Sequence, residues 1–169
     1  MRFDTRAALE YARQGRLEEW VHAYLNSGAW KNLGLSDGLK RQPRWWRGPL
    51  ELPLSDLARC VGVEEGMEYH VSQEYWEGRM ASMIESIHSS GAGPLDMPPL
   101  IATYDPNLAT PAHLWVRDGN HRLGAYERLG WPSAWVLIWY NSQEEYNALK
   151  VNPGVWERNR YGSRWRRKF

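Results

Sequence analysis

VRDGNHR, at residues 116–122, is the stretch that decides the fold of this chain. The apolar residues Leu114–Val116 lead into it, and a helical pattern follows it. We therefore expect a strand, a glycine turn and a helix start, a geometry that presents free backbone N–H groups to an anion. Gly119 can adopt backbone angles closed to other residues, which lets the chain approach a ligand closely.

Three side chains in this turn carry chemistry. Arg122 offers a fork of donors suited to phosphate or carboxylate. His121 can donate, accept or carry a proton near neutral pH. Asp118 suits an anion site if it binds a metal, orients a partner or takes a proton. The alternative is a plain turn, because Asp-Gly is a common turn dipeptide and Asn120 is a good helix N-cap.

The residues after the turn favour a ligand site. Leu123, Tyr126 and Leu129 recur at helical spacing, and Gly130 stands where a helix ends. Residues 133–140 then read as a buried strand. The turn is thus expected between two core strands, joined through a helix.

Residues 116–140 resemble the signature of the ParB/sulfiredoxin superfamily, in which a strand leads into a D-G-x-H-R or G-x-R-R turn, a helix and a further strand. Residues 49–57 are similar to the opening strand of that family, and residues 77–91 to its "SI…G" helix. Residues 98–102 resemble its "P-x-x-V" strand. The likeness covers about residues 49–141 and implies an α+β fold, a small mixed sheet with packed helices.

The resemblance also implies a function, phosphate chemistry on a nucleotide such as ATP, ADP or CTP with Mg²⁺. In the ADP-dependent free serine kinases of the superfamily, a loop glutamate activates the acceptor hydroxyl and the turn grips phosphates. By that likeness Glu64 or Glu65 would be the base, and Asp118 would hold Mg²⁺ or assist it. His121 and Arg122 would stabilise the transferring phosphoryl group. Phosphate binding would fall to the residues of the turn: Gly119, Asn120, His121 and Arg122.

Other activities of the superfamily fit less well. Sulfiredoxin uses a cysteine just before the His-Arg pair, where this chain has Asn120, and Cys60 is distant in sequence. Partitioning ParB proteins carry a separate helix-turn-helix domain, for which the segment after residue 141 leaves no room. A nucleotide-dependent phosphotransferase or NTPase acting on a small molecule is the leading hypothesis, and a ParB-like nucleic-acid-binding protein or nuclease is the alternative.

Composition and the positions of turn-forming residues divide the chain into three parts. Residues 1–48 form a helical extension with an N-terminal helical hairpin, followed by a basic and aromatic connector. Residues 49–141 form the ParB-like domain, and residues 142–169 a helix with a basic tail. The net charge of +1 gives no global drive toward nucleic acid or membranes, and Cys60, the only cysteine, suits a reducing compartment. No apolar run can span a bilayer and no secretion signal opens the chain, so a cytoplasmic protein is expected.

Two segments interleave basic and aromatic residues, residues 40–47 and the tail from Arg158 to Lys168. Such interleaving can bind single-stranded nucleic acid by stacking and phosphate contacts. The alternatives are a loop held to the body by its tryptophans and a solvated chain end. A third functional hypothesis is a protein that keeps this fold, binds a partner and catalyses nothing.

Overall fold

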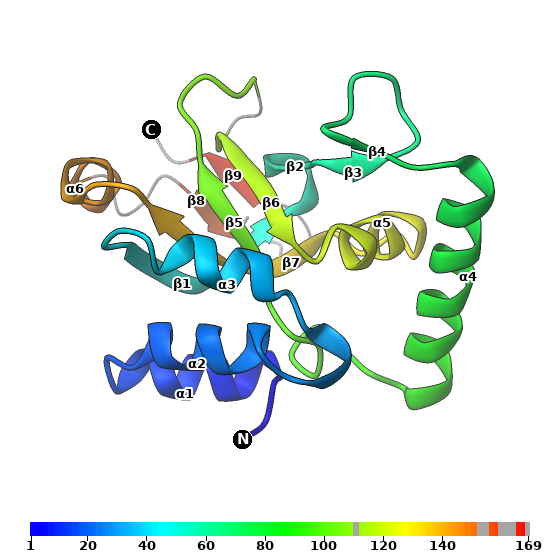
Figure 1. Cartoon of the computed structure of the whole chain (residues 1–169), viewed down its shortest axis with the longest axis horizontal. Helices are drawn as coiled ribbons and strands as arrows, with labels where there is room; N and C mark the ends of the chain where they lie inside the picture. The colour runs from blue at the N-terminus through cyan, green and yellow to red at the C-terminus, as the bar shows by residue number, and fades with distance from the viewer. Residues whose placement is uncertain (110–111, 152–155, 159–164, 168–169) are drawn as a thin grey trace.

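The computed structural model describes residues 1–109, 112–151, 156–158 and 165–167 (Figure 1). Its helical segments are α1 (Thr5–Arg13), α2 (Leu17–Leu25), η1 (Gly28–Trp30), α3 (Leu33–Leu39), η2 (Leu54–Asp56), α4 (Gln73–Ser90), α5 (Asn120–Arg128) and α6 (Gln143–Val151). Its strands are β1 (Trp45–Pro53), β2 (Leu57–Arg59), β3 (Val61–Gly62), β4 (Tyr69–His70), β5 (Leu100–Tyr104), β6 (Leu114–Asp118), β7 (Ser133–Tyr140), β8 (Trp156–Arg158) and β9 (Trp165–Arg167). The side chains of the basic tail lie outside the described residues.

A mixed sheet of five strands organises the molecule, in the order β1-β7-β5-β6-β2. The β1/β7 and β5/β6 pairs are antiparallel, whereas β5/β7 and β2/β6 are parallel. Helices cover the sheet, so the α+β class predicted from the sequence is confirmed. The strand, glycine turn and helix expected around residues 116–122 are β6, Gly119 and α5.

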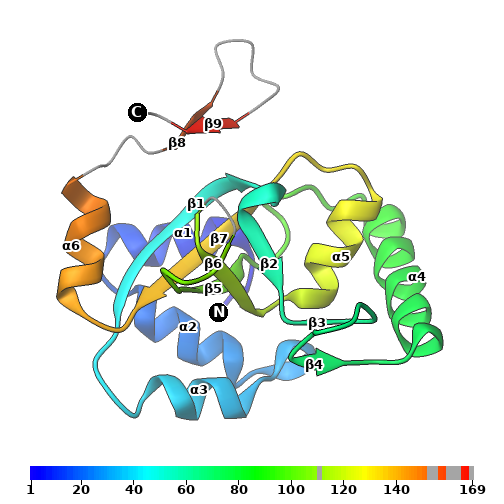
Figure 2. The same cartoon turned by 90° about the horizontal axis from the view of Figure 1, so that it is seen from above.

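The two faces of the sheet bury different helices because side chains alternate along each strand. Leu100, Val116 and Val136 point into a core that also contains buried residues of α4 and α5. Ile101 and Leu137 point into the opposite core, with the buried residues of α1, α2 and α3. Figure 2 shows α5 lying between the sheet and α4.

Close contact between α4 and α5 depends on a glycine in α5. A Cβ atom on Gly124 would lie 2.6 Å from Cζ2 of Trp76 and 2.9 Å from Sδ of Met80. Both side chains lie on the apolar stripe of α4, and both are buried. The stripe therefore fixes α4 beside the start of α5.

Several helices begin or end at residues whose side chains or backbone conformation cap a helix. The Asp4 carboxylate accepts a hydrogen bond from Ala7 N at 2.8 Å, and the Ser72 hydroxyl accepts one from Tyr75 N at 3.2 Å. Each of these bonds satisfies an amide that has no partner within its helix. Gly130 follows α5 with φ of +70°, the left-handed conformation that a glycine after a helix supplies.

Three segments differ from the sequence-based expectation. The opening strand begins at Trp45 rather than residue 49, and the connector before it contains α3. Trp46 packs against Trp139 of β7, so it belongs to the sheet instead of a loop. The loop expected to supply the glutamate base contains the short parallel pair of β3 and β4. The strand residues outside the expected bounds were missed because long-range pairing, and not local propensity, stabilises strands.

Within the described part of the chain, none of the helices combines the length and the apolar character that a membrane crossing requires.

Candidate functional site

The turn between β6 and α5 has the geometry that the sequence predicted. Gly119 has φ of +95° and is the residue before the first helical position. A Cβ atom there would lie 2.6 Å from Cδ2 of Leu100 and 2.8 Å from Nη2 of Arg122. Leu123 N donates the first hydrogen bond of the helix to Gly119 O at 2.9 Å. The amides of residues 120–122 therefore have no acceptor within α5, as at any helix start.

Arg122 points into the protein. Its side chain is buried, with 1% of the residue exposed. Nη2 donates to Tyr24 Oη at 2.8 Å and to Asp118 Oδ2 at 3.1 Å, and Nη1 donates to the Pro98 carbonyl. The guanidinium also lies 4.9 Å from the ring centre of Trp30. This placement does not fit the phosphate contact expected of Arg122. The guanidinium instead stabilises the turn through its contacts on the protein side.

Asp118 completes this buried network. Its Oδ2 accepts from the Tyr24 hydroxyl at 2.9 Å and its Oδ1 accepts from Asn32 Nδ2 at 3.0 Å, in addition to the Arg122 ion pair. No group of three metal-ligating side chains occurs among the described residues. A carboxylate whose two oxygens already accept three donors does not fit the Mg²⁺ ligand or the assisting base that the resemblance implied. Asp118 positions Arg122 and ties the turn to the segment that contains α2.

Asn120 is a structural residue as well. Its Oδ1 accepts from Cys60 N at 2.8 Å, and its Nδ2 donates to Val116 O at 3.0 Å. The Cys60 thiol is buried beside it and donates to the same carbonyl at 3.1 Å. Burial raises the pKa of Cys60, and the Asn120 hydrogen bond opposes that rise. The side chain of Asn120 thus joins the residue after β2 to the turn.

His121 is the residue of the motif that faces the outer surface. Its ring lies 5.3 Å from that of Trp76 and 6.0 Å from that of Tyr75, both in α4. Nε2 is buried and has no hydrogen-bond partner among the described residues. Burial lowers the pKa of His121, and the positive charges of Arg79 and Arg59 lower it further. A buried nitrogen without a partner, near two cations, is suited to an anionic ligand.

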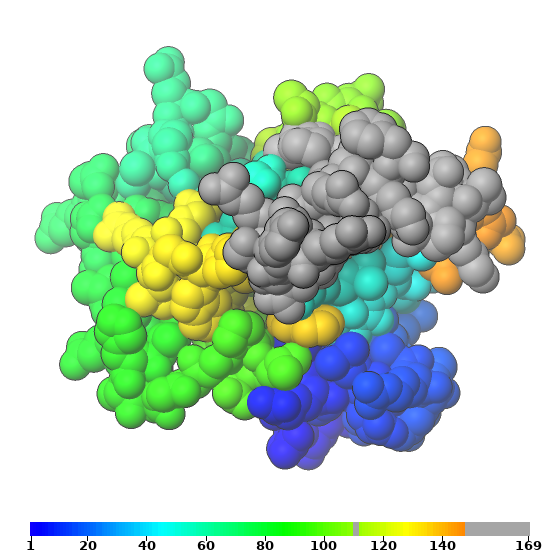
Figure 3. Space-filling view, turned by 180° about the vertical axis from the view of Figure 1, so that it is seen from behind, coloured from blue at the N-terminus to red at the C-terminus, as the bar shows by residue number. Residues whose placement is uncertain are grey.

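A depression on the first half of α4 lies near His121, because its lining includes Tyr75, whose ring is 6.0 Å from that of His121. Ser72, Glu74, Tyr75, Gly78 and Arg79 line it, and its volume is about 460 Å³. Arg79 is exposed and has no carboxylate partner in the part of the chain that the structure describes. Figure 3 shows α4 and α5 as one continuous surface, with the loop of β3 and β4 projecting above it.

Arg59 also lies at this surface, but its charge is already balanced. Its guanidinium lies 4.8 Å from the ring centre of Trp76 and pairs with Glu64, and Nε lies 3.6 Å from Glu127 Oε2. Burial raises the pKa of Glu127, and Arg59 opposes that rise. Among the described residues of this surface, Arg79 is therefore a cation that is free to meet a ligand.

The loop carboxylates are not equivalent. Glu64 accepts hydrogen bonds from Arg59, and this contact lowers the pKa of Glu64, which makes it a weaker base. Glu68 is paired with Arg117 at 2.5 Å. Glu65 is exposed and has no such partner among the described residues. Of the two glutamates predicted as base, Glu65 is the one available to a ligand.

Several residues of the site were missed by sequence reasoning. Tyr24 and Asn32 hold Asp118 from another part of the chain, and Arg79 lies on the polar face of α4. Tyr24 belongs to an apolar helical stripe and Arg79 resembles a solvated charge, so neither carries a local signal. Only the packing of α2 and α4 against the ends of the turn reveals them.

Comparison with known proteins finds no matching family model and no matching curated protein. Among solved structures, the chain resembles ParB, sulfiredoxin and free serine kinase. A free serine kinase in complex with AMP is 19% identical with a TM-score of 0.38, over 53% of this chain and 30% of that chain. Sulfiredoxin from Arabidopsis thaliana is 19% identical with a TM-score of 0.38, over 59% of this chain and 92% of that chain. C-terminally truncated ParB from Caulobacter crescentus, complexed with CTP-gamma-S, is 18% identical with a TM-score of 0.37, over 63% of this chain and 49% of that chain.

The matched part spans about a third of the free serine kinase and half of ParB. The roles of individual residues therefore rest on the geometry of this chain.

Proposed function

We propose that this chain binds the phosphate groups of a nucleotide where α5 begins, next to the depression on the first half of α4. The observation that carries the proposal is the buried Nε2 of His121, unpartnered among the described residues and close to Arg79. The amides of residues 120–122, which have no acceptor within α5, add donors on the same helix end, where the helix dipole favours negative charge. AMP in the free serine kinase and CTP-gamma-S in ParB suggest which nucleotides to test.

The reaction we propose is phosphoryl transfer to a small-molecule hydroxyl, or to water. Glu65 takes the proton of the attacking hydroxyl as its oxygen bonds to phosphorus, and the bond from phosphorus to the nucleotide oxygen breaks. His121 and Arg79 offset the charge on the phosphoryl oxygens. Such chemistry requires mainly positioning and charge stabilisation, which are the roles proposed for these three residues. Asp118 and Arg122 hold the turn in place, and no step depends on Mg²⁺.

Replacement of Arg79 with alanine tests the binding site. Calorimetric titration with ATP, ADP and CTP, with and without Mg²⁺, should give binding by the unaltered protein. Arg79→Ala should weaken that binding about tenfold or more, because a hydrogen bond to a charged group contributes about 1.5–3 kcal/mol. Arg13→Ala, an exposed arginine on α1, is the matched control and should bind normally. Absence of binding by the unaltered protein, or equal binding by Arg79→Ala, contradicts the proposal.

Glu65→Gln separates catalysis from binding. The amide cannot accept the proton of the hydroxyl, so phosphate release should fall by about 100-fold or more while nucleotide affinity stays within about twofold. Glu68→Gln is the control, because Glu68 is paired with Arg117. Equal turnover by Glu65→Gln and the unaltered protein would exclude Glu65 as the base and leave the binding site intact.

A further inference from the structure

A second depression lies on the face of the sheet opposite α4 and α5. It is a groove of about 670 Å³ between α3 with the residues that follow it and the ends of β5, β6 and β7. This volume lies within the range typical of ligand sites. The groove shares no residue with the depression near His121. Nothing in the function proposed above uses it.

Aromatic side chains of fixed orientation lie along the sheet side of the groove. Trp115 Nε1 donates to Asp105 Oδ2 at 3.2 Å, and the Arg117 guanidinium lies 5.9 Å from the Trp115 ring centre. Trp115 is only half-buried, so part of its ring is accessible. Trp139 lies deeper, supported by Trp46 at 6.2 Å. These contacts hold the flat apolar rings in place, so a ligand that stacks on them does not have to order the side chains first.

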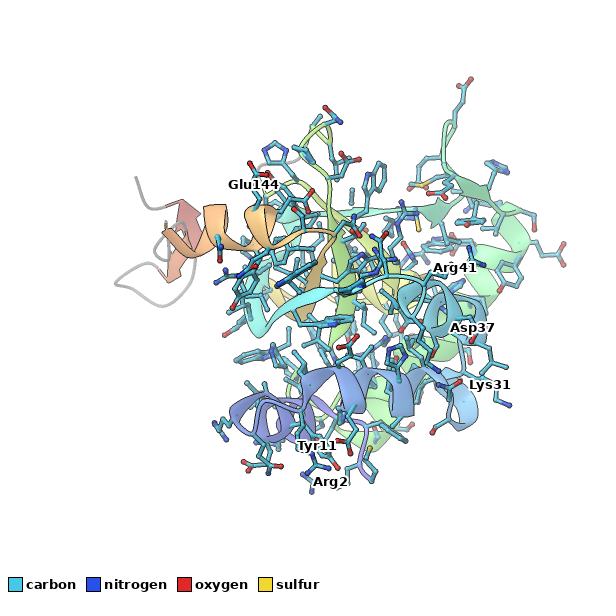
Figure 4. The ribbon with its side chains drawn as sticks, turned by 60° about the vertical axis from the view of Figure 1, so that its left-hand side comes forward. Arg2, Tyr11, Lys31, Asp37, Arg41 and Glu144 are labelled. Atoms are coloured by element: carbon cyan, nitrogen blue, oxygen red, sulfur yellow. The ribbon has the colours of Figure 1, made fainter. Side chains whose placement is uncertain are left out.

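Three arginines line the same groove: Arg41, Arg44 and Arg117. Arg44 donates to the carbonyls of Leu39 and Gly38 at the end of α3, which fixes its position. Arg41 is exposed and has no carboxylate partner in the described part of the chain. Figure 4 shows Arg41 beyond the end of α3, on the side of the molecule that also carries Lys31.

Two carboxylates also line the groove, and both already accept protein donors. Asp105 accepts from Trp115 Nε1 and from Asn107 N, and Glu145 accepts from the Asn141 amide at 3.1 Å. The donors that remain for a ligand come from the segment after α3, namely Arg41 and Gln42. The groove therefore offers stacking surfaces on one wall and cationic donors on the other.

We propose that this groove binds single-stranded nucleic acid, with a base stacked on Trp115 and a backbone phosphate next to Arg41. Fixed aromatic rings beside guanidinium groups are the combination that binds single strands without sequence preference. An acidic peptide would use the arginines but would leave the indole ring of Trp115 unused, so nucleic acid is the better match. Residues 40–47, which interleave basic and aromatic residues, thus contribute Arg41 and Arg44 to this wall and Trp46 to its support.

The test is fluorescence anisotropy of labelled single-stranded oligonucleotides of about 12 nucleotides, a length within the range of single-strand binding sites. Arg41→Glu and Trp115→Leu should each weaken binding about fivefold or more. Lys31→Glu reverses an exposed charge just before α3 and is the matched control, with less than about a twofold change expected. The salt dependence of binding should become shallower in Arg41→Glu, because a phosphate contact is lost.

Arg79→Ala distinguishes this proposal from the function proposed above, because it should impair nucleotide binding and leave oligonucleotide binding unchanged. Equal weakening by Lys31→Glu and Arg41→Glu would show diffuse charge attraction and overturn the groove assignment. So would unaltered binding by Trp115→Leu, or competition by an acidic peptide as strong as by the oligonucleotide. Failure of the unaltered protein to bind any oligonucleotide at low salt would also overturn it.

Discussion

Gly119 is subject to two separate constraints, a backbone angle and a lack of space. Its φ of +95° is strained for any residue with a side chain, and the nearest atoms to a Cβ belong to Leu100 and Arg122. Gly66 has a similar φ of +85° but nothing within 4 Å of such an atom. The two glycines therefore separate the cost of strain from the cost of crowding.

Gly119→Ala should lower the free energy of unfolding by about 2–4 kcal/mol, the sum of strain and overpacking. Gly66→Ala should cost only about 1–2 kcal/mol, the price of the left-handed conformation alone. Urea denaturation measures both. Equal losses for the two variants would contradict the close packing of Gly119 on Leu100 and Arg122.

At the same scale, Asp118 and Arg122 show why a motif does not reveal the direction of its side chains. The i, i+4 spacing allows the pair to meet, but solvent exposure decides whether they meet a ligand or each other. In this chain Tyr24 and Asn32 supply the additional hydrogen bonds that a buried ion pair requires. That arrangement depends on α2 and the segment after it.

Among the elements, α4 and α5 form the wall that makes His121 unusual. Gly124 allows the two helices to approach, so that Trp76 covers the imidazole. Burial and the two neighbouring arginines lower the pKa of His121 from its usual value of 6.5. In the unfolded chain the ring takes up a proton near that usual value, so the unfolded state binds the proton first as the pH falls.

His121→Phe should therefore gain stability relative to the unaltered protein in acid. Above about pH 7.5 the difference in free energy of unfolding between the two proteins should be constant. Below about pH 6.5 the unaltered protein should lose stability relative to the variant, because its unfolded state binds more protons than its folded state. Phenylalanine keeps the ring contacts with Trp76 and Tyr75 and removes the titration. Denaturation curves between about pH 5 and 8, a range that extends about 1.5 units on either side of the usual pKa, measure the difference. A flat difference over that range would exclude a lowered pKa at His121.

Considered as a whole molecule, the N-terminal helices are part of the core. Trp20, Tyr24 and Leu25 have no exposed surface, and they share a core with Ile101 and Leu137 of the sheet. Burial of each large apolar side chain contributes about 1.5–3 kcal/mol. The sequence divides the chain at residue 48, whereas the packing joins residues on both sides of that boundary.

A fragment of residues 49–141 should fail to fold cooperatively. It lacks the first half of β1 and the helices that cover one face of the sheet, and it leaves the Asp118–Arg122 pair without Tyr24. We expect no sigmoidal thermal transition and strong binding of a hydrophobic dye, in contrast to the full chain. Addition of a peptide of residues 1–44 should partly restore the transition. A cooperative transition of the fragment alone would show that residues 49–141 form an independent domain.

The sequence by itself determined the order of the elements and the form of the turn. Periodicity, capping residues and glycine act over a few neighbouring residues, so they predicted α1, α2, α4, the strand and helix around Gly119, and β7. The tertiary structure decided which side chains face a ligand. Arg122 turns inward because Asp118, Tyr24 and the Pro98 carbonyl surround it, and Arg79 joins His121 because α4 packs on α5. Those contacts join residues that are distant in sequence, and their energies depend on burial, which no local pattern specifies.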